Sequence, residues 1–364
     1  RGHDYRKGAK LSMDSYGRLL PAPNRFPSTE NENGFKPIAQ YIHSKGLKFG
    51  IHLMRGIPRQ AVDQNTPVLG TDFHAADIAD KSSICKWNTD MYGVDMSKPG
   101  AQEYYNSVFN LLASWEVDFV KVDDLSRPYK DHIKEIEAIR KAIDQTGRPM
   151  VLSTSPGETP LDVADHVSNH ANMWRISDDF WDDWKALKEQ FTRCRNWAKT
   201  TGPGHWPDAD MLPFGAVRQD RPTGWTHFTK DEQITCMTLW CISRSPLIMG
   251  GHMPKNDEFT LSLLTNDEVI AVDQHSQNGR ELSSKDGLVV WVADVPNSPD
   301  KYVALFNTKD AENAVRVSFS DAGLPASCKV RDLWKKQDVG PYTSVYSQAF
   351  LAHSSGLFRI GPGN

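Results

Sequence analysis

Carboxylates recur where short apolar stretches end, and the first such pair is Asp123 and Asp124. They close residues 117–122, whose β-branched and aromatic side chains are typical of a buried strand. Lys121, inside that strand, must find a partner or a water-filled pocket. In a barrel of alternating strands and helices, catalytic groups lie at the carboxyl ends of the strands. The alternative is that both acids cap a helix expected over residues 131–145.

A second stretch, residues 174–184, holds four acids and three tryptophans, where a predicted strand leads into a helix. Asp182 and Asp183 fit the first turn of that helix, because carboxylates there complement its dipole. Asp178 and Asp179 precede the helix, where the loop after a strand would direct them at the barrel mouth. Arg175 is suited to bind a hydroxyl or a carboxylate.

A third stretch, residues 203–212, brings Trp206, Asp208 and Asp210 to another strand end. Indole faces stack on the C–H groups of sugar rings, and carboxylates accept hydrogen bonds from hydroxyls. A single Trp is more often a packing residue. Acids and tryptophans that recur at successive strand ends nevertheless indicate a carbohydrate site.

Composition excludes several other classes of protein. The 364 residues carry a formal net charge of −4 and no long basic run, which argues against nucleic acid or an anionic membrane as partner. The five scattered cysteines lack metal-type spacing, so neither a disulfide framework nor structural zinc is expected. No apolar run reaches membrane-spanning length and no Asn-x-Ser/Thr acceptor occurs. We expect a soluble protein of a bacterial cytoplasm or periplasm rather than of a glycosylated secretory route.

The periodicity alternates between strand and helix, which predicts a parallel sheet. After a turn-rich segment over residues 1–34, helices are expected over 35–44, 99–115, 131–145, 182–198 and 230–243. Strands are expected over 47–53, 118–123, 149–153, 172–176, 205–212 and 246–250. These six strands are two short of a closed (β/α)8 barrel.

The pattern changes after residue 264 to short alternating strands, typical of an antiparallel sandwich. These strands are expected over 288–292, 301–307, 315–319, 328–333 and 356–360. We therefore predict a catalytic barrel domain over residues 1–268 and a C-terminal β-sandwich domain over residues 269–364.

Together these motifs resemble glycoside hydrolase family 27, the α-galactosidase and α-N-acetylgalactosaminidase group. The resemblance extends over nearly the whole chain, with the motifs in one order. It rests on residues 14–19, 25–27, 42–51, 115–123, Trp174-Arg175 with Asp179, 206–212, 245–247 and 355–359.

The resemblance implies that Asp123 is the nucleophile and that Asp179, four residues after Arg175, is the acid/base. Lys121 and Arg175 would hold sugar hydroxyls. A retaining mechanism needs two carboxyls about 5 Å apart. Lys121 shares the strand face of Asp123 and would keep it ionised, whereas Asp179 would need a raised pKa to act first as an acid. Asp178 is the rival for that role.

Three further residues are expected to bind substrate: Ser155, Trp87 and Asp210. Ser155 replaces the Glu that reaches the sugar O2 in galactosidases, and a small residue there resembles the N-acetylgalactosaminidase solution. Leu125 replaces a cysteine that pairs in disulfide-bearing members of the family, so Cys85 is expected to be a free thiol.

The family's first two strands, which bear a Gly-Trp-Asn-Ser-Trp motif and an Asp-Asp pair, are not in this sequence. A barrel without two adjacent strands would expose edges. We expect an upstream N-terminal segment that was cleaved, is disordered or is supplied by another chain. Intact-mass analysis that finds this chain alone in an active sample would contradict this hypothesis.

The sequence thus predicts a retaining exo-α-glycosidase on a (β/α)8 TIM barrel followed by a β-sandwich. The expected substrates are carbohydrates with terminal α-D-galactosides or α-N-acetyl-D-galactosaminides. No metal and no organic cofactor is implied, because two carboxylates and water suffice. The alternatives are another pyranosidase, such as one for β-L-arabinopyranosides, and a non-hydrolytic carbohydrate-binding protein.

Overall fold

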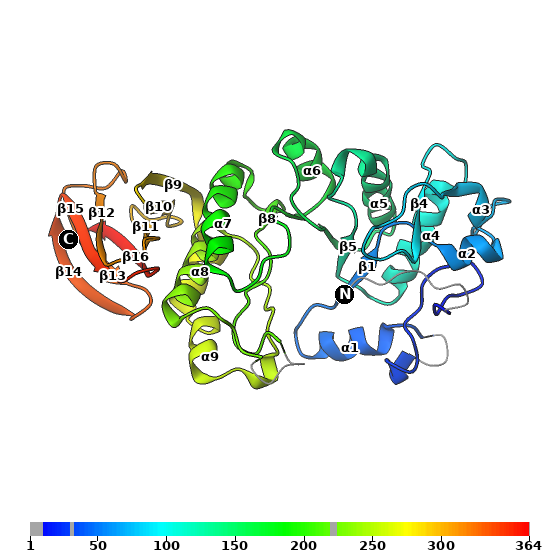
Figure 1. Cartoon of the computed structure of the whole chain (residues 1–364), viewed down its shortest axis with the longest axis horizontal. Helices are drawn as coiled ribbons and strands as arrows, with labels where there is room; N and C mark the ends of the chain where they lie inside the picture. The colour runs from blue at the N-terminus through cyan, green and yellow to red at the C-terminus, as the bar shows by residue number, and fades with distance from the viewer. Residues whose placement is uncertain (1–9, 30–32, 219–223, 364) are drawn as a thin grey trace. The chain divides into compact units, whose positions relative to one another are not determined.

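The computed structural model describes residues 10–29, 33–218 and 224–363. The chain divides into two compact units, Arg1–Arg175 and Ile176–Asn364 (Figure 1).

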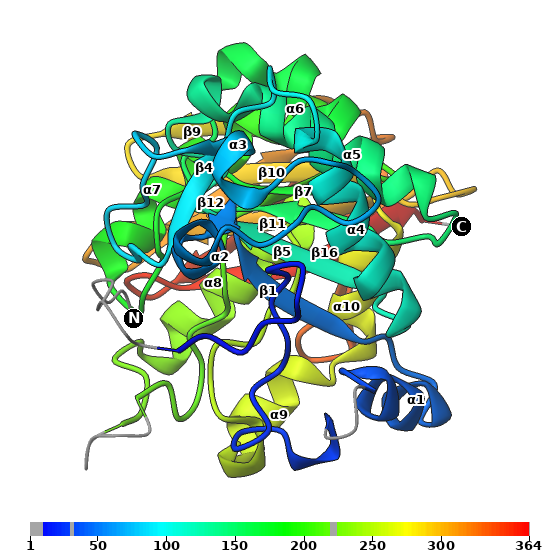
Figure 2. The ribbon, with the colours of Figure 1, turned by 90° about the vertical axis from the view of Figure 1, so that its right-hand side faces the viewer.

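A parallel sheet forms the centre of the first unit. Its strands run in the order β1 (Gly50–Met54), β5 (Phe119–Asp123), β6 (Val151–Thr154) and β7 (Met173–Arg175). Figure 2 shows β1 and β5 side by side, and Met54 lies opposite Asp123 in their ladder. The predicted strands over 118–123 and 149–153 are therefore confirmed.

One helix precedes these strands and three connect them. They are α1 (Lys36–Ser44), α4 (Ala101–Ser114), α5 (Ile133–Gln145) and α6 (Ala164–His170). On α5 the buried side chains include Ile136, Ile139 and Ile143, at the spacing of a single helix face. Helix α6 was not predicted, because its seven residues are mostly polar.

A small antiparallel sheet between β1 and α4 was also not predicted. Its order is β2 (Ile57–Pro58), β4 (Met91–Val94) and β3 (Ala79–Asp80), with helices α2 (Arg59–Gln64) and α3 (Ala75–Ile78) beside it. Strands of two to four residues are too short to show alternation.

The second unit begins with barrel-type elements. They are α7 (Trp184–Trp197), β8 (Trp206–Asp208), α8 (Lys230–Ser243), α9 (Glu258–Leu264) and α10 (Asp267–His275). Helix α8 starts at a capping box in which Thr229 and Glu232 each accept the other's backbone N–H. The strand predicted over 246–250 is wrong: only Leu212 and Met249 form an isolated bridge, because Pro246 lacks an N–H and two glycines follow Met249.

Two antiparallel sheets complete the second unit. The larger has the order β14-β13-β16-β11-β10-β9 and the smaller pairs β12 with β15. Their buried faces share a core that includes Val292, Val303, Val317 and Phe358. The strands are β9 (Gln277–Lys285), β10 (Leu288–Asp294), β11 (Lys301–Asn307), β12 (Asn313–Ser318), β13 (Ser327–Asp332), β14 (Gln337–Thr343), β15 (Val345–Phe350) and β16 (Ser355–Pro362).

Both parts of the predicted fold class are confirmed: parallel strands with helices of the (β/α)8 barrel type, then an antiparallel β-sandwich. The upstream strands and the domain boundary at residue 268 stay predictions. Among the helices that the structure describes, none is both long and apolar enough to cross a bilayer.

Candidate active site

Asp123 is the last residue of β5, and three groups surround its carboxylate. The Ser155 hydroxyl donates to Oδ1 at 3.1 Å, and the backbone N–H of Asp124 donates to the same oxygen at 3.0 Å. His52 Nε2 lies 3.7 Å from Oδ2, which is longer than a hydrogen bond, so this contact is electrostatic. These contacts come from β1, from the residue after β5 and from the residue after β6.

The pKa of Asp123 reflects these neighbours. Burial alone would raise it, but His52, the Asp124 N–H and the Ser155 hydroxyl outweigh burial and lower the pKa to about 2. Asp123 is therefore an ionised carboxylate at neutral pH, the state that a nucleophile requires.

The strand register places Lys121 on the same face of the sheet as this carboxylate. Lys121 and Asp123 are two residues apart on β5 and so share a face. Lys121 lies opposite His52 on one side and opposite Ser153 on the other. Since residues opposite one another in a parallel ladder point the same way, His52, Lys121 and Asp123 face one side of the sheet.

Behind the nucleophile lies a buried ion cluster. The Arg55 side chain, 3% exposed, donates to the Asp124 carboxylate at 2.7 Å and to Glu135 Oε1 at 2.6 Å. The Tyr105 hydroxyl donates to the other Glu135 oxygen. The backbone N–H of Arg55 donates to the Asp123 carbonyl at 3.0 Å, and its guanidinium donates to the Asp124 carbonyl at 2.9 Å, so Arg55 holds the chain at the end of β5.

This cluster corrects the helix-capping alternative for Asp123 and Asp124. Helix α5 is preceded by a short 3₁₀ turn, and its N-terminal cap is His132, without a capping side-chain bond. Asp124 pairs with Arg55 instead and adopts a left-handed backbone with φ of 63°. A non-glycine residue in that conformation is uncommon, and here a buried ion pair holds it.

In the second unit, Asp179 lies in the segment that leads into α7. Its side chain is exposed, and its N–H donates to Asp178 Oδ1 at 3.0 Å. The next residue, Phe180, is 2% exposed and packs on the Trp240 ring with centroids 5.1 Å apart. Asp210 Oδ2 accepts the Phe180 N–H at 2.7 Å. Asp179 is thus an exposed acid beside a firmly anchored residue.

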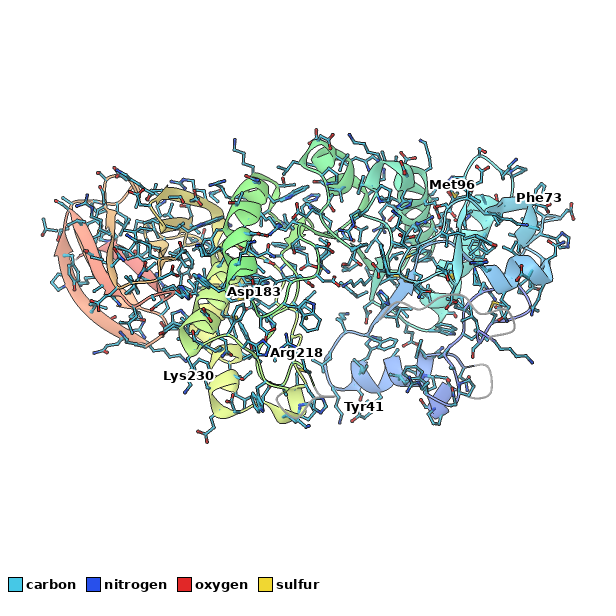
Figure 3. The ribbon with its side chains drawn as sticks, viewed as in Figure 1. Tyr41, Phe73, Met96, Asp183, Arg218 and Lys230 are labelled. Atoms are coloured by element: carbon cyan, nitrogen blue, oxygen red, sulfur yellow. The ribbon has the colours of Figure 1, made fainter. Side chains whose placement is uncertain are left out.

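Asp182 and Asp183 have structural contacts. Asp183 is the N-cap of α7 and accepts the Ala186 N–H at 3.0 Å. Asp182 is buried and forms an ion pair with Arg218, which also lies over the Trp181 ring. Figure 3 labels Asp183, the residue before α7, and Arg218, from the segment before α8. A helix-dipole role is therefore wrong for Asp182, which precedes the helix and binds a loop.

Two family models match this chain, one in its central part and one in its C-terminal part. Residues 93–275 match the model described as Alpha galactosidase A, and residues 285–360 match the alpha galactosidase C-terminal β-sandwich domain. α-Galactosidase 3 of Arabidopsis thaliana is 30% identical over 363 residues, which cover 97% of this chain and 71% of that protein. The chain belongs to glycoside hydrolase family 27.

Solved structures of similar proteins support the same family. A family 27 β-L-arabinopyranosidase of Geobacillus stearothermophilus, in complex with arabinose, is 52% identical with a TM-score of 0.95, covering 99% of this chain and 85% of that chain. A Bacillus halodurans protein, provisionally named an α-N-acetylgalactosaminidase, is 47% identical with a TM-score of 0.87, covering 98% and 85%. This chain is accordingly a glycoside hydrolase, as the sequence analysis predicts.

The structure places the remaining predicted residues of this family 27 enzyme as follows. Arg175 ends β7 and is 2% exposed, and its carbonyl accepts the Thr159 N–H at 3.1 Å. Trp87 is half-buried in the loop between β3 and β4. That loop also carries Cys85, a buried free thiol as expected, whose pKa burial raises to about 11. The charges of Asp124 and Asp123 raise this pKa further.

Ser155 and Asp210 both bind protein groups. Ser155 is 1% exposed and donates to Asp123, and one oxygen of Asp210 accepts the Phe180 N–H. Their predicted contacts with substrate, like the catalytic roles of Asp123 and Asp179, stay predictions.

Sequence reasoning missed His52, Arg55 and Glu135. The signal for His52 was present, since it is a polar residue within the predicted strand 47–53. Its pairing with Lys121 follows from the register of β1 against β5. For Arg55 and Glu135 the sequence carries no comparable signal, because their contact depends on how α5 packs.

Proposed function

We propose that this family 27 glycoside hydrolase is a retaining exo-glycosidase that prefers terminal β-L-arabinopyranosides and accepts α-D-galactosides less well. The observation that carries the proposal is the 52% identity, over 99% of the chain, with a β-L-arabinopyranosidase of the same family. The α-galactosidase of Arabidopsis thaliana is 30% identical over a similar length.

The similarity of the two sugars explains why enzymes of one fold can act on either of them. A β-L-arabinopyranoside has the ring configuration of an α-D-galactoside and lacks its hydroxymethyl group. A pocket fitted to the smaller ring has little room and no contacts for the hydroxymethyl group. It should therefore favour the arabinoside over the galactoside by about 10–200-fold in kcat/KM. α-N-Acetyl-D-galactosaminides are the third candidates, because Ser155 is small where galactosidases carry a Glu.

In the proposed mechanism Asp123 attacks the anomeric carbon and forms a covalent glycosyl-enzyme. Its low pKa, set by His52, the Asp124 N–H and Ser155, keeps the attacking oxygen deprotonated. Lys121 on the same face would bind a hydroxyl of the sugar ring.

Asp179 is proposed to protonate the leaving oxygen and then to deprotonate the attacking water. The spacing of four residues from Arg175, which the family resemblance carries, favours Asp179 over Asp178 for this role. One oxygen of Asp178 accepts the Asp179 N–H and so stabilises the turn. Phe180, bound to Asp210 and packed on Trp240, would hold Asp179 in position.

The substrate assignment is tested with p-nitrophenyl β-L-arabinopyranoside, α-D-galactoside and α-N-acetyl-D-galactosaminide. We expect kcat/KM to be highest for the arabinoside, by about 10–200-fold over the galactoside. A preference for either of the other two sugars would contradict the proposal. Binding of sugar without turnover of any substrate would favour the carbohydrate-binding alternative.

The residue roles are tested with Asp123→Asn and Asp179→Asn, with Asp178→Asn as the matched control. We expect Asp123→Asn to lower kcat by a factor on the order of 10³ or more. Asp179→Asn should cost about 10²–10⁴-fold on a disaccharide and less on a nitrophenyl glycoside, whose leaving group needs little protonation. If Asp178→Asn shows that leaving-group dependence instead, the acid/base is Asp178.

The stereochemistry of the first product gives an independent test. A retaining enzyme releases β-L-arabinopyranose from a β-L-arabinopyranoside, visible by proton NMR before mutarotation. Initial formation of the α anomer would exclude a nucleophilic role for Asp123.

A further inference from the structure

Two histidines and a glutamate converge on the helices α5 and α6. Glu137 comes from α5, and His166 and His170 lie one turn apart on α6. One ligand atom from each of the three side chains lies within 4.8 Å of the others. His166 Nε2 is 3.5 Å from Glu137 Oε1, and the two imidazole rings lie 4.1 Å apart at an angle of 18°. None of these residues has a part in the proposed glycosidase mechanism.

The second nitrogen of each imidazole is already engaged. His166 Nδ1 lies 2.8 Å from the Tyr129 hydroxyl, and His170 Nδ1 donates to the His166 carbonyl at 2.7 Å. Histidine ligands to a metal typically donate a hydrogen bond from one ring nitrogen, which fixes the ring and leaves the lone pair of the other nitrogen for the metal. His170 has this arrangement, and His166 has it in the tautomer whose Nδ1–H donates to Tyr129. Glu137 is oriented in the same way, since Lys134 donates to its Oε2 at 3.0 Å and leaves Oε1 toward His166.

We propose that Glu137, His166 and His170 bind a zinc ion, with water as the fourth ligand. Two imidazoles and one carboxylate are a common ligand set for zinc with one open position. Tetrahedral bonds of about 2.0–2.1 Å place the ligand atoms about 3.3–3.5 Å apart. The His166–Glu137 separation has this value, and small side-chain rotations would bring His170 Nε2 to it. The ion would tie α6 to α5 and would take no part in hydrolysis.

Zinc uptake by the whole enzyme tests the proposal. Enzyme stripped with EDTA is titrated with zinc chloride by calorimetry, and its thermal midpoint is measured with and without zinc. We expect one zinc per chain, with an increase of several degrees in the midpoint. Cobalt chloride alone should give visible absorption bands of a four-coordinate site.

The variants His170→Ala and Glu137→Gln should each weaken zinc binding at least tenfold and abolish the increase in the midpoint. His275→Ala, which removes an exposed histidine at the end of α10, is the matched control and should bind as the wild type does. Both site variants should keep the glycosidase activity of the zinc-free enzyme, which also shows that they fold.

Zinc could also bind between His52 and Asp123, so the substitutions decide where it binds. One zinc per chain in the wild type that persists in both His170→Ala and Glu137→Gln would overturn the proposal. So would the absence of stoichiometric binding by the wild-type enzyme. If His170→Ala does not fold, the Glu137→Gln titration and the cobalt spectrum give the same decision.

Discussion

Asp123 combines two properties that usually oppose each other. Its side chain is largely buried, with only 20% exposed, yet its pKa is low. Desolvation favours the protonated form of a carboxylate, and hydrogen bonds to the charged form reverse that preference. Only one of the donors, the Ser155 hydroxyl, can be removed without changing a charge or the backbone. Ser155 is therefore the residue through which the ionisation of the nucleophile can be adjusted.

We predict that Ser155→Ala raises the pKa of Asp123 and lowers kcat/KM at acidic pH. A depressed carboxyl pKa keeps the group ionised as the pH falls, so losing a donor moves the acidic limb of kcat/KM to higher pH. A hydrogen bond to a charged group contributes about 1.5–3 kcal/mol, which corresponds to a factor of about 10–100 in the acid dissociation constant of Asp123. The measurement is a pH profile on the preferred nitrophenyl glycoside.

The control for this experiment is Ser126→Ala. Ser126 is also buried and lies in the loop after β5, but its hydroxyl has no hydrogen-bond partner among the residues that the structure describes. Its profile should match the wild type. An unshifted acidic limb in Ser155→Ala would mean that Ser155 does not set the ionisation of Asp123.

At the scale of elements, the Arg55 cluster joins β1, the end of β5 and helix α5. We predict that Glu135→Gln destabilises the protein by about 3–5 kcal/mol, because removing one member of a buried ion pair leaves its partner uncompensated. Activity should fall as well, since the Arg55 guanidinium also donates to the carbonyl of Asp124, the residue after the nucleophile. Denaturant unfolding and kcat give the two readouts.

Asp144→Asn is the matched control on the same helix. Asp144 pairs with Arg140 at 2.6 Å, but its side chain is 65% exposed. Exposed pairs contribute about 0–1 kcal/mol, so this variant should be nearly as stable as the wild type. Equal losses of unfolding free energy in the two variants would show that the buried cluster stabilises the protein no more than an exposed pair does.

Elements with strong local signals were predictable from sequence. Helix α8 has the predicted bounds because Thr229 and Glu232 form its capping box, and β11 matches because its apolar residues run without interruption. Strands β9, β14 and β15 were missed because polar, largely exposed side chains hide their alternation.

The candidate site was predictable only in part, for a physical reason. Asp123 and Lys121 lie on one strand, so their shared face follows from local geometry. The contacts of Asp123 with His52 and Ser155 depend on the register of three strands, and the anchoring of Phe180 by Asp210 depends on a long-range contact. Spacing along the chain does not encode such contacts.

At the scale of the whole second unit, helix α8 joins the barrel-type helices to the sandwich. It contacts α7 and α10 as well as β11 and β16, and ten of its fourteen residues are buried. Polar bonds add to this packing: Thr235 donates to the His353 carbonyl at 2.7 Å, and the Trp334 indole donates to Thr238 at 2.9 Å. Because most of α8 is buried, both the barrel-type helices and the sandwich are needed to cover it.

We therefore predict that removal of residues 277–364 yields aggregated protein without activity, because one side of α8 would be exposed as an apolar patch. Size-exclusion chromatography and circular dichroism of the truncated protein test this. A monomeric, cooperatively unfolding product would show instead that the barrel-type part does not need the sandwich.

The five cysteines are all buried and all reduced. Burial raises the pKa of the thiols of Cys194, Cys236 and Cys241, so little reactive thiolate forms in the native protein. The native state is therefore indifferent to the redox potential around it, and its formation requires no oxidant. The unfolded chain is different, because it exposes all five thiols. An oxidant can then join them in disulfides that are incompatible with the native fold.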